Sequence, residues 1–307
     1  MDPIAAAVAR SIGDALGTSQ AAFSLEPVGG GCIHRASKLT TDARDGKHAW
    51  FVKANDAGKA PMFEAEARGL ASLARAGAIR VPAVVAGPVI GDDDSHDGDE
   101  APAWLVLEWL DLVPLDTRSG ARLGEALAAQ HRRPQPKFGW ARDNFIGSSP
   151  QSNVLADDWL DFWRTHRLHM QLRYAAHNRL PSRMISRGER LLADAEILFR
   201  DHAPEKSLLH GDLWGGNASA LEDGTPVVFD PAVYVGDREA DLAMTELFGG
   251  FPKDFHSAYR NAWPLSDGYP VRRDFYNLYH VLNHANLFGG SYVGQAEKLI
   301  EKVLAEF

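Results

Sequence analysis

The sequence contains a single cysteine, Cys32, among its 307 residues. One cysteine excludes an internal disulfide and a cysteine-rich zinc site, and it fits a reducing compartment. No run of apolar residues reaches the roughly 18 needed to cross a bilayer. The N-terminus carries an early acid, Asp2, where a secretory signal would have basic residues. These features predict a soluble, cytoplasmic protein.

Positive charge is also scarce. The chain has 32 Lys and Arg against 41 Asp and Glu, a net charge of −9, and no basic block. A general nucleic-acid binder would normally present a positive surface, so we expect no nucleic-acid partner, and no membrane partner either. The most acidic stretch, residues 91–100, does not match the spacing of a calcium loop and is interpreted as a solvated loop.

The periodicity of apolar residues changes along the chain and predicts two lobes. The β-rich lobe, 1–109, is expected to contain helices at 4–16 and 62–76 and strands near 25–28, 33–41, 49–53, 84–90 and 104–109. The helical lobe, 110–307, is expected to contain helices at 120–132, 156–178, 183–201, 272–287 and 292–306, with strands and turns at 207–231.

The strongest functional signal is the segment from His210 to Asn217, which reads His-Gly-Asp-Leu-Trp-Gly-Gly-Asn. Asp212 precedes Asn217 by five positions, as in the kinase catalytic loop, where the Asp accepts the proton of the attacking hydroxyl and the Asn holds Mg²⁺. A short apolar strand then ends in Asp230, a second carboxylate suited to a hard cation. Such residues also favour turns without any chemistry, but their order here predicts a kinase-type site.

The N-terminal half offers the groups that such a site needs for a nucleotide. Lys53 lies on a predicted strand, the context of a phosphate-pairing lysine. The following helix carries Glu64 and Glu66, either of which could pair with Lys53. We favour Glu66, because its surroundings fit the corresponding helix of small-molecule kinases better.

Two further segments are candidates for nucleotide binding. Gly29, Gly30 and Gly31 lie between predicted strands, where their backbone amides could approach phosphates. This run is neither a Walker loop nor a Gly-x-Gly-x-x-Gly motif. Glu108 and Leu110 fall where an adenine would meet the backbone between the lobes, a position that is equally compatible with a buried strand.

Cys32 follows the glycine run directly. An exposed thiol beside free amides can be reactive, so one hypothesis is that oxidation joins two chains through Cys32 and distorts ATP binding. The other is that a small residue merely fits this loop. The sequence leaves both open, and with them a monomer or a homodimer.

Taken together, these segments resemble the fructosamine kinase (ketosamine-3-kinase) family, within the aminoglycoside-phosphotransferase-like and protein-kinase-like group. The resemblance covers nearly the whole chain, and its most specific parts are Asp212-Leu213-Trp214 and the Phe-Gly-Gly-Phe-Pro run at 248–252. The other matching segments are 29–33, 51–53, 62–66, 144–147, 157–159, 167–168, 229–232 and 282–289.

The resemblance implies an α+β, two-lobed protein-kinase-like fold, with an antiparallel sheet and one helix in a nucleotide-binding lobe and a mainly helical catalytic and substrate lobe. It implies ATP-dependent phosphorylation of the 3-hydroxyl of a ketosamine (a sugar joined to an amine by glycation), which would mark the adduct for breakdown. Asp212 would be the base, Asn217 and Asp230 the Mg²⁺ ligands, and Lys53 the phosphate ligand. His-Gly-Asp and Asp-Pro-Ala replace the protein-kinase His-Arg-Asp and Asp-Phe-Gly, which favours a small-molecule substrate.

Four more residues have competing interpretations. We hypothesise that Trp214 stacks on the substrate, although packing beneath the catalytic loop would explain it as well. His284 is a substrate-side candidate only through the family resemblance. Asp237 and Asp241 are expected to form caps and ion pairs that brace the catalytic loop.

Two alternative functions remain open at this point. One is a kinase for another small hydroxyl or amino compound, such as an aminoglycoside, choline or a thio-sugar, and the two family-specific segments argue against it. The other is a nucleotide-binding pseudokinase, against which stands the presence of Lys53, Asp212, Asn217 and Asp230 together.

Overall fold

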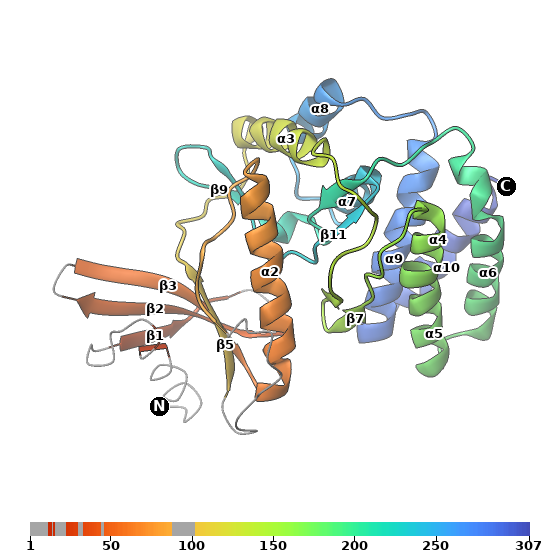
Figure 1. Cartoon of the computed structure of the whole chain (residues 1–307). Coiled ribbons are helices and arrows are strands. Elements are labelled where there is room, and N and C mark those ends of the chain that lie inside the picture. The colour runs from red at the N-terminus through yellow and green to blue at the C-terminus, as the bar shows by residue number, and fades with distance from the viewer. Residues whose placement is uncertain (1–11, 14, 16–22, 30–32, 44–45, 88–101) are drawn as a thin grey trace. The chain divides into compact units, whose positions relative to one another are not determined.

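The computed structural model describes residues 12–13, 15, 23–29, 33–43, 46–87 and 102–307 (Figure 1). Most of the helix expected at 4–16, the residues Gly30, Gly31 and Cys32, and the acidic stretch 91–100 lie outside this part of the chain. The chain divides into two compact units. The N-terminal unit comprises 1–75 and 81–112, and the C-terminal unit comprises 76–80 and 113–307.

The N-terminal unit contains a five-stranded antiparallel sheet in the order β1-β2-β3-β5-β4. Its strands are β1 (Phe23–Pro27), β2 (Arg35–Ala43), β3 (Gly46–Asn55), β4 (Val84–Ala86) and β5 (Ala103–Glu108). Leu39, Val52 and Val106, from three adjacent strands, form a small core with Ile12. Strand β5 is buried on both faces, because its consecutive residues Leu105, Val106 and Leu107 point alternately to the two sides of the sheet and all are buried.

One long helix, α2 (Ala60–Ala76), follows a short 3₁₀ turn, η1 (Ala57–Lys59), and runs alongside this sheet (Figure 1). Phe63, Ala67 and Leu70 are buried at spacings of four and three, as an amphipathic helix requires. The helix expected at 62–76 is therefore confirmed, and it carries Glu66 opposite the strand that holds Lys53.

The C-terminal unit is mainly helical. Its helices are α3 (Thr117–His131), α4 (Trp159–Trp163), α5 (His169–His177), α6 (Ser182–Asp194), α7 (Arg238–Leu247), α8 (Lys253–Ala262), α9 (Tyr269–Phe288) and α10 (Ser291–Leu304). Its two-stranded antiparallel sheets are β6 (Asn144–Ile146) with β7 (Ser149–Gln151), β8 (Ser207–Leu209) with β11 (Tyr234–Gly236), and β9 (Ala218–Ala220) with β10 (Pro226–Val228). Three short turns complete it: η2, a π-helical turn (Arg164–Leu168), η3 (Ala195–Phe199) and η4 (Gly215–Asn217). The α+β class predicted from the sequence is confirmed.

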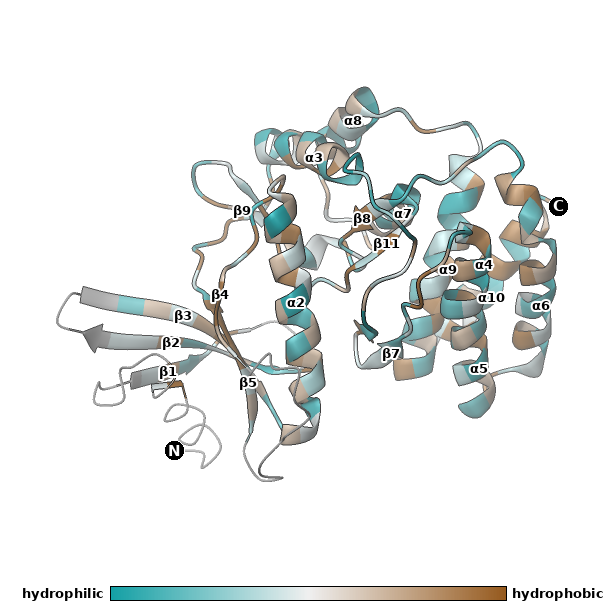
Figure 2. Ribbon diagram, viewed as in Figure 1, coloured by the Kyte–Doolittle hydropathy of each residue, from teal (hydrophilic) through white to brown (hydrophobic). Residues whose placement is uncertain are grey.

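An aromatic core holds the C-terminal unit together. Trp159 and Trp163 on α4 pack against Tyr276 on α9, with ring centroids 6.1 and 5.0 Å apart. Hydrophobic and hydrophilic residues alternate along α6 and α10, which bury one face each (Figure 2). No helix in the described part of the chain is long and apolar enough to cross a membrane.

Two features of this unit differ from the sequence prediction. The expected helix at 156–178 begins later, at Trp159, and the π-helical turn lies between α4 and α5. Helices α7 and α8 were not predicted. In α7 nearly every residue is buried, including Arg238, Glu239 and Asp241, so polar residues occupy positions where a helix pattern would show apolar ones.

Candidate active site

The segment from His210 to Asn217 begins where a small sheet ends. Strand β8 leads into it and pairs with β11, with Leu209 opposite Tyr234. His210 then connects both sides of the site, because its Nδ1 accepts the backbone N–H of Asp212 (3.3 Å) and its Nε2 lies 2.9 Å from the carbonyl oxygen of Phe229. An imidazole that accepts at Nδ1 and donates from Nε2 is neutral. Burial, which lowers the pKa of His210, favours the same form.

Gly211 allows the chain to turn sharply between His210 and Asp212. Its φ is +82°, and a Cβ at this position would lie 2.1 Å from the carbonyl oxygen of Ala232. No larger residue fits against that backbone. This contact explains why the motif here reads His-Gly-Asp.

Asp241 on α7 holds this turn in place. Its carboxylate accepts the backbone N–H of His210 (2.7 Å) and of Gly211 (2.9 Å), and it lies 3.2 Å from Nε2 of His131 on α3. Burial raises the pKa of Asp241, but the hydrogen bond from His131 and those from the loop outweigh it, so the pKa lies below its ordinary value. The predicted bracing role of Asp241 is confirmed. His131, a buried histidine four residues after Leu127, was not singled out from the sequence.

Asn217 contacts both Asp212 and Asp230. Its Nδ2 lies 2.9 Å from the backbone oxygen of Asp212, 3.4 Å from Oδ2 of Asp212 and 3.4 Å from the backbone oxygen of Asp230. Its side-chain oxygen makes no hydrogen bond to the residues that the structure describes. The arrangement places the carboxamide of Asn217 against the carboxylate of Asp212 and the backbone of Asp230, and oxygen-bearing side chains of these types suit a hard cation such as Mg²⁺.

The carboxylate of Asp212 is in an unfavourable place for a charge. Burial is the main reason that its pKa is raised to about 7, and the negative charges of Asp230 and Asp241 raise it further. A strongly perturbed carboxylate with specific charged neighbours is typical of a functional site.

This raised pKa predicts a pH-dependent cost to stability. The pKa of Asp212 in the folded state lies above the unfolded value of 3.8. The folded state therefore has its full stability below pH 3.8, and it loses stability as the pH rises from there through about 7. Without Mg²⁺ and nucleotide, Asp212→Asn should therefore stabilise the protein by about 2–3 kcal/mol more at pH 8 than at pH 5, because the folded-state pKa of about 7 lies roughly two pH units above 5. Thermal melts in EDTA at both pH values measure the difference. An equal shift at both would contradict it.

Asp230 has an unusual backbone conformation for a residue other than glycine. Its φ is +55°, in the left-handed region that Asn and Asp tolerate better than other side chains. Buried amides hold the chain just beyond it: Nδ2 of Asn144 donates to the carbonyl oxygen of Val233 (2.8 Å), and Nε2 of Gln151 donates to that of Ala232 (3.2 Å). These contacts join residues more than 80 positions apart. No sequence pattern indicated the amides, apart from the family segment at 144–147.

Arg167 supports those amides from the π-helical turn. It is fully buried, and its Nη2 donates to Oδ1 of Asn153 (2.7 Å) while its Nη1 donates to the carbonyl oxygen of Ser152 (2.6 Å). Its guanidinium lies 4.1 Å from the ring centre of Tyr234, a cation–π arrangement. Arg167 thereby anchors the hairpin that holds the segment after Asp230.

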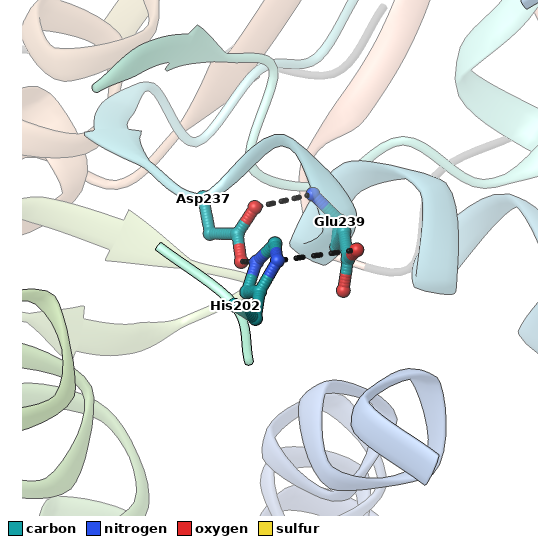
Figure 3. A group of neighbouring side chains, drawn as sticks. All are labelled: His202, Asp237 and Glu239. Carbon is teal, nitrogen blue, oxygen red and sulfur yellow. Dashed lines mark hydrogen bonds and ion pairs between the residues drawn. The ribbon is translucent and has the colours of Figure 1, made fainter. Parts of the chain in front are cut away.

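A second polar cluster lies at the start of α7 (Figure 3). Asp237 caps this helix, and its Oδ2 accepts from Nε2 of His202 (2.6 Å) and from the hydroxyl of Tyr276 (2.7 Å). His202, Asp237 and Glu239 are residue types that bind metals, but Arg272 already donates to both carboxylate oxygens of Glu239, at 2.7 and 3.0 Å. The cluster is a buried ion-pair network, and the predicted capping role of Asp237 is confirmed.

In the N-terminal unit, Nζ of Lys53 lies 2.7 Å from Oε1 of Glu66, and both side chains are largely buried. This is the pairing that the sequence favoured over Glu64. Gly29 lies in an exposed bend between β1 and β2. The chain leaves the sheet after Glu108, so the backbone of Leu110 takes no part in the ladder of β5.

The two substrate-side candidates lie in the C-terminal unit and contact the same side chain. Trp214 is 40% exposed, and its ring lies against Gly216 of the catalytic loop. Its ring centre is 6.3 Å from that of Phe248, which is 5.3 Å from that of His284. Trp214, Phe248 and His284 thus form a continuous set that starts two residues after Asp212.

Comparison with known proteins agrees with this geometry. The family model described as fructosamine kinase matches residues 4–306. A probable ketoamine kinase of Synechocystis sp. is 42% identical over 282 residues, which cover 90% of this chain and 89% of the relative. The chloroplastic protein-ribulosamine 3-kinase of Arabidopsis thaliana is 38% identical, over 90% of this chain and 81% of its own length.

A solved structure is similar to this chain over nearly its whole length. A candidate fructosamine-3-kinase from Thermobifida fusca superposes with a TM-score of 0.82 at 30% identity, covering 97% of this chain and 98% of that one. The choline kinase LicA of Streptococcus pneumoniae, at 15% identity and a TM-score of 0.61, covers 98% of this chain and 99% of that one and shares the fold alone.

Proposed function

Because this chain belongs to the fructosamine kinase family, we propose that it transfers the γ-phosphoryl group of ATP to the 3-hydroxyl of a ketosamine, as a step in deglycation. The observation that carries the proposal is that one side chain, Asn217, contacts both acidic residues: its Nδ2 lies 3.4 Å from Oδ2 of Asp212 and 3.4 Å from the backbone oxygen of Asp230. The names of the relatives, ketoamine kinase and protein-ribulosamine 3-kinase, support a ketosamine as the acceptor.

In this mechanism Asp212 is the general base. The 3-hydroxyl donates a hydrogen bond to its carboxylate and gives up its proton as the oxygen attacks the γ-phosphorus. The bond from that phosphorus to the β,γ-bridging oxygen breaks, and ADP leaves. Burial is the main cause that raises the pKa of Asp212 above its ordinary value, which supports the role, because a carboxylate with a higher pKa is a stronger base.

Asn217, through its Oδ1, and Asp230, through its carboxylate, are the residues that would hold Mg²⁺. Two observations fit this assignment: the amide nitrogen of Asn217 is turned toward Asp212 and Asp230, and Asp230 raises the pKa of Asp212 through its negative charge. A site with excess negative charge favours a divalent cation. When bound, Mg²⁺ supplies positive charge that offsets the charge of the triphosphate.

We assign the triphosphate itself to Lys53, oriented by Glu66, and to the backbone of the loop that begins at Gly29. Lys53 on a strand with an acid partner on the following helix is the arrangement that pairs with the α- and β-phosphates in kinases. The backbone beyond Glu108 and toward Leu110 is the proposed adenine contact.

The Lys53–Glu66 pair gives a prediction with an internal control. Glu66→Gln removes the charge that orients Lys53, so the KM for ATP should rise about tenfold, equivalent to roughly 1.4 kcal/mol. The KM for the ketosamine should change little. Glu64→Gln, two residues earlier on the same helix, should leave both constants unchanged. Equal effects of the two substitutions in steady-state kinetics would contradict the role of the pair.

An ADP-release assay tests the proposed function directly. We expect turnover with fructosamines and ribulosamines, no turnover with aminoglycosides or choline, and a product phosphorylated at O3 by NMR. Turnover with an aminoglycoside alone would reassign the acceptor. ATP binding without turnover of any acceptor would instead indicate a pseudokinase.

A further inference from the structure

The set that starts at Trp214 continues across the surface of the C-terminal unit. From His284 it extends to Phe288, one helical turn along α9, and to Tyr292 at the start of α10, with ring centres 5.7 and 4.9 Å from that of His284. Phe288 and Tyr292 also contact each other at 6.4 Å. We call Trp214, Phe248, His284, Phe288 and Tyr292 the aromatic row.

Three of the five side chains of the aromatic row are exposed. Trp214 is 40% exposed, Phe248 39% and Phe288 58%. Single exposed aromatic residues are common, but exposed rings in mutual contact mark a binding surface more often than a structural one. The row also contains no Lys, Arg, Asp or Glu.

Glycines fix the row to the catalytic loop. A Cβ on Gly215 would lie 2.8 Å from the backbone oxygen of Gly249 and 3.0 Å from Cα of Gly250, so the loop packs backbone to backbone against the segment that carries Phe248. A Cβ on Gly216 would lie 2.3 Å from the Trp214 ring, so the indole rests on the loop itself. The end of the row formed by Trp214 and Phe248 is therefore held against the catalytic loop by close contacts.

His284 adds one polar group to the row, an imidazole with one nitrogen already hydrogen-bonded. Its Nδ1 lies 2.8 Å from the carbonyl oxygen of His280, to which it donates. In the neutral imidazole the other nitrogen, Nε2, is then a hydrogen-bond acceptor. The row thus combines apolar ring faces with an acceptor for an N–H or O–H group.

A ketosamine has two ends, the sugar and the substituent carried by its amine. If the 3-hydroxyl is held at Asp212, as the proposed function requires, the amine end must extend beyond the sugar. We propose that the aromatic row binds this amine substituent and makes the enzyme selective for aromatic or long aliphatic amines over small acidic ones. Stacking favours an apolar substituent, the rings also attract the ammonium group, and the row has no cationic side chain for a carboxylate.

Two ketosamines that share fructose and differ only in the amine test this inference: the adduct of benzylamine and the adduct of glycine. In the ADP-release assay, wild type should have about a tenfold higher kcat/KM for the benzylamine adduct. Phe288→Ala and Phe248→Ala should each lower that value about fivefold, through KM, because they remove ring contacts worth roughly 1 kcal/mol. Turnover of the glycine adduct should change less than about twofold, which converts to under roughly 0.5 kcal/mol.

Phe307→Ala is the matched control, since Phe307 is 37% exposed at the far end of α10 from Tyr292. It should leave both substrates unaffected. Equal turnover of the two adducts by wild type, or a parallel loss of both in the variants with unchanged thermal stability, would overturn the inference alone. No turnover of any ketosamine would overturn the proposed function, and the inference with it.

Discussion

Asp212→Asn is expected to lower kcat at least about a thousandfold, within the range attributed to a general base, while the affinity for ATP is retained. The substitution keeps the shape of the side chain but removes its capacity to accept a proton. The backbone groups of Asp212 remain in place, because its N–H donates to His210 and its carbonyl oxygen accepts from Asn217 at 2.9 Å. The loss should therefore be confined to the chemical step.

ADP-release kinetics and calorimetric titration with ATP measure the two quantities separately. Asp201→Asn, an exposed residue outside the site, serves as the control and should behave as wild type. If Asp212→Asn kept more than a tenth of the wild-type kcat, another group would have to accept the proton.

Asp241→Asn should have the largest effect on stability. The carboxylate of Asp241 accepts from two backbone N–H groups and contacts His131, all of them buried. An Asn side chain has one acceptor oxygen and an NH₂ group that only donates, so this NH₂ group would face at least one of these N–H donors. Breaking a buried charged network by changing one partner costs about 3 kcal/mol.

For a unit of this size that cost corresponds to a fall in Tm of about 8 °C, and kcat should fall as well because the catalytic turn loses its anchor. Differential scanning calorimetry measures the first effect, and Asp267→Asn in an exposed loop should leave Tm unchanged. A variant with wild-type Tm would mean that the turn is held by the close contact at Gly211 alone.

Local patterns in the sequence were sufficient to predict the strands of the N-terminal unit and α2. In these elements apolar residues recur at the period of the structure, as Phe63, Ala67 and Leu70 do. The convergence of Asp212 and Asn217 was also predictable, because five residues of one loop separate them. The pairing of Lys53 with Glu66 could be chosen over Glu64 only through likeness to other small-molecule kinases.

Apart from Asp237 and Asp241, the supports of the site could not be predicted, because they come from distant parts of the chain and from polar side chains on buried faces. His131 reaches Asp241 across 110 positions. Arg167 occupies a fully buried position where a periodic pattern would require an apolar residue. Each polar group is tolerated there only because carbonyls, amides or rings from other elements surround it, and no local window of sequence contains those partners.

The backbone at Asp230 has a consequence for how this enzyme can change over evolutionary time. With φ at +55°, the position admits few residues without strain, chiefly Asp, Asn and Gly. Asn would satisfy the backbone equally well and yet lack the negative charge. If Asp230 holds Mg²⁺ as proposed, the single substitution Asp230→Asn would give an inactive protein that still folds, whereas most other substitutions at this position would impair both folding and catalysis.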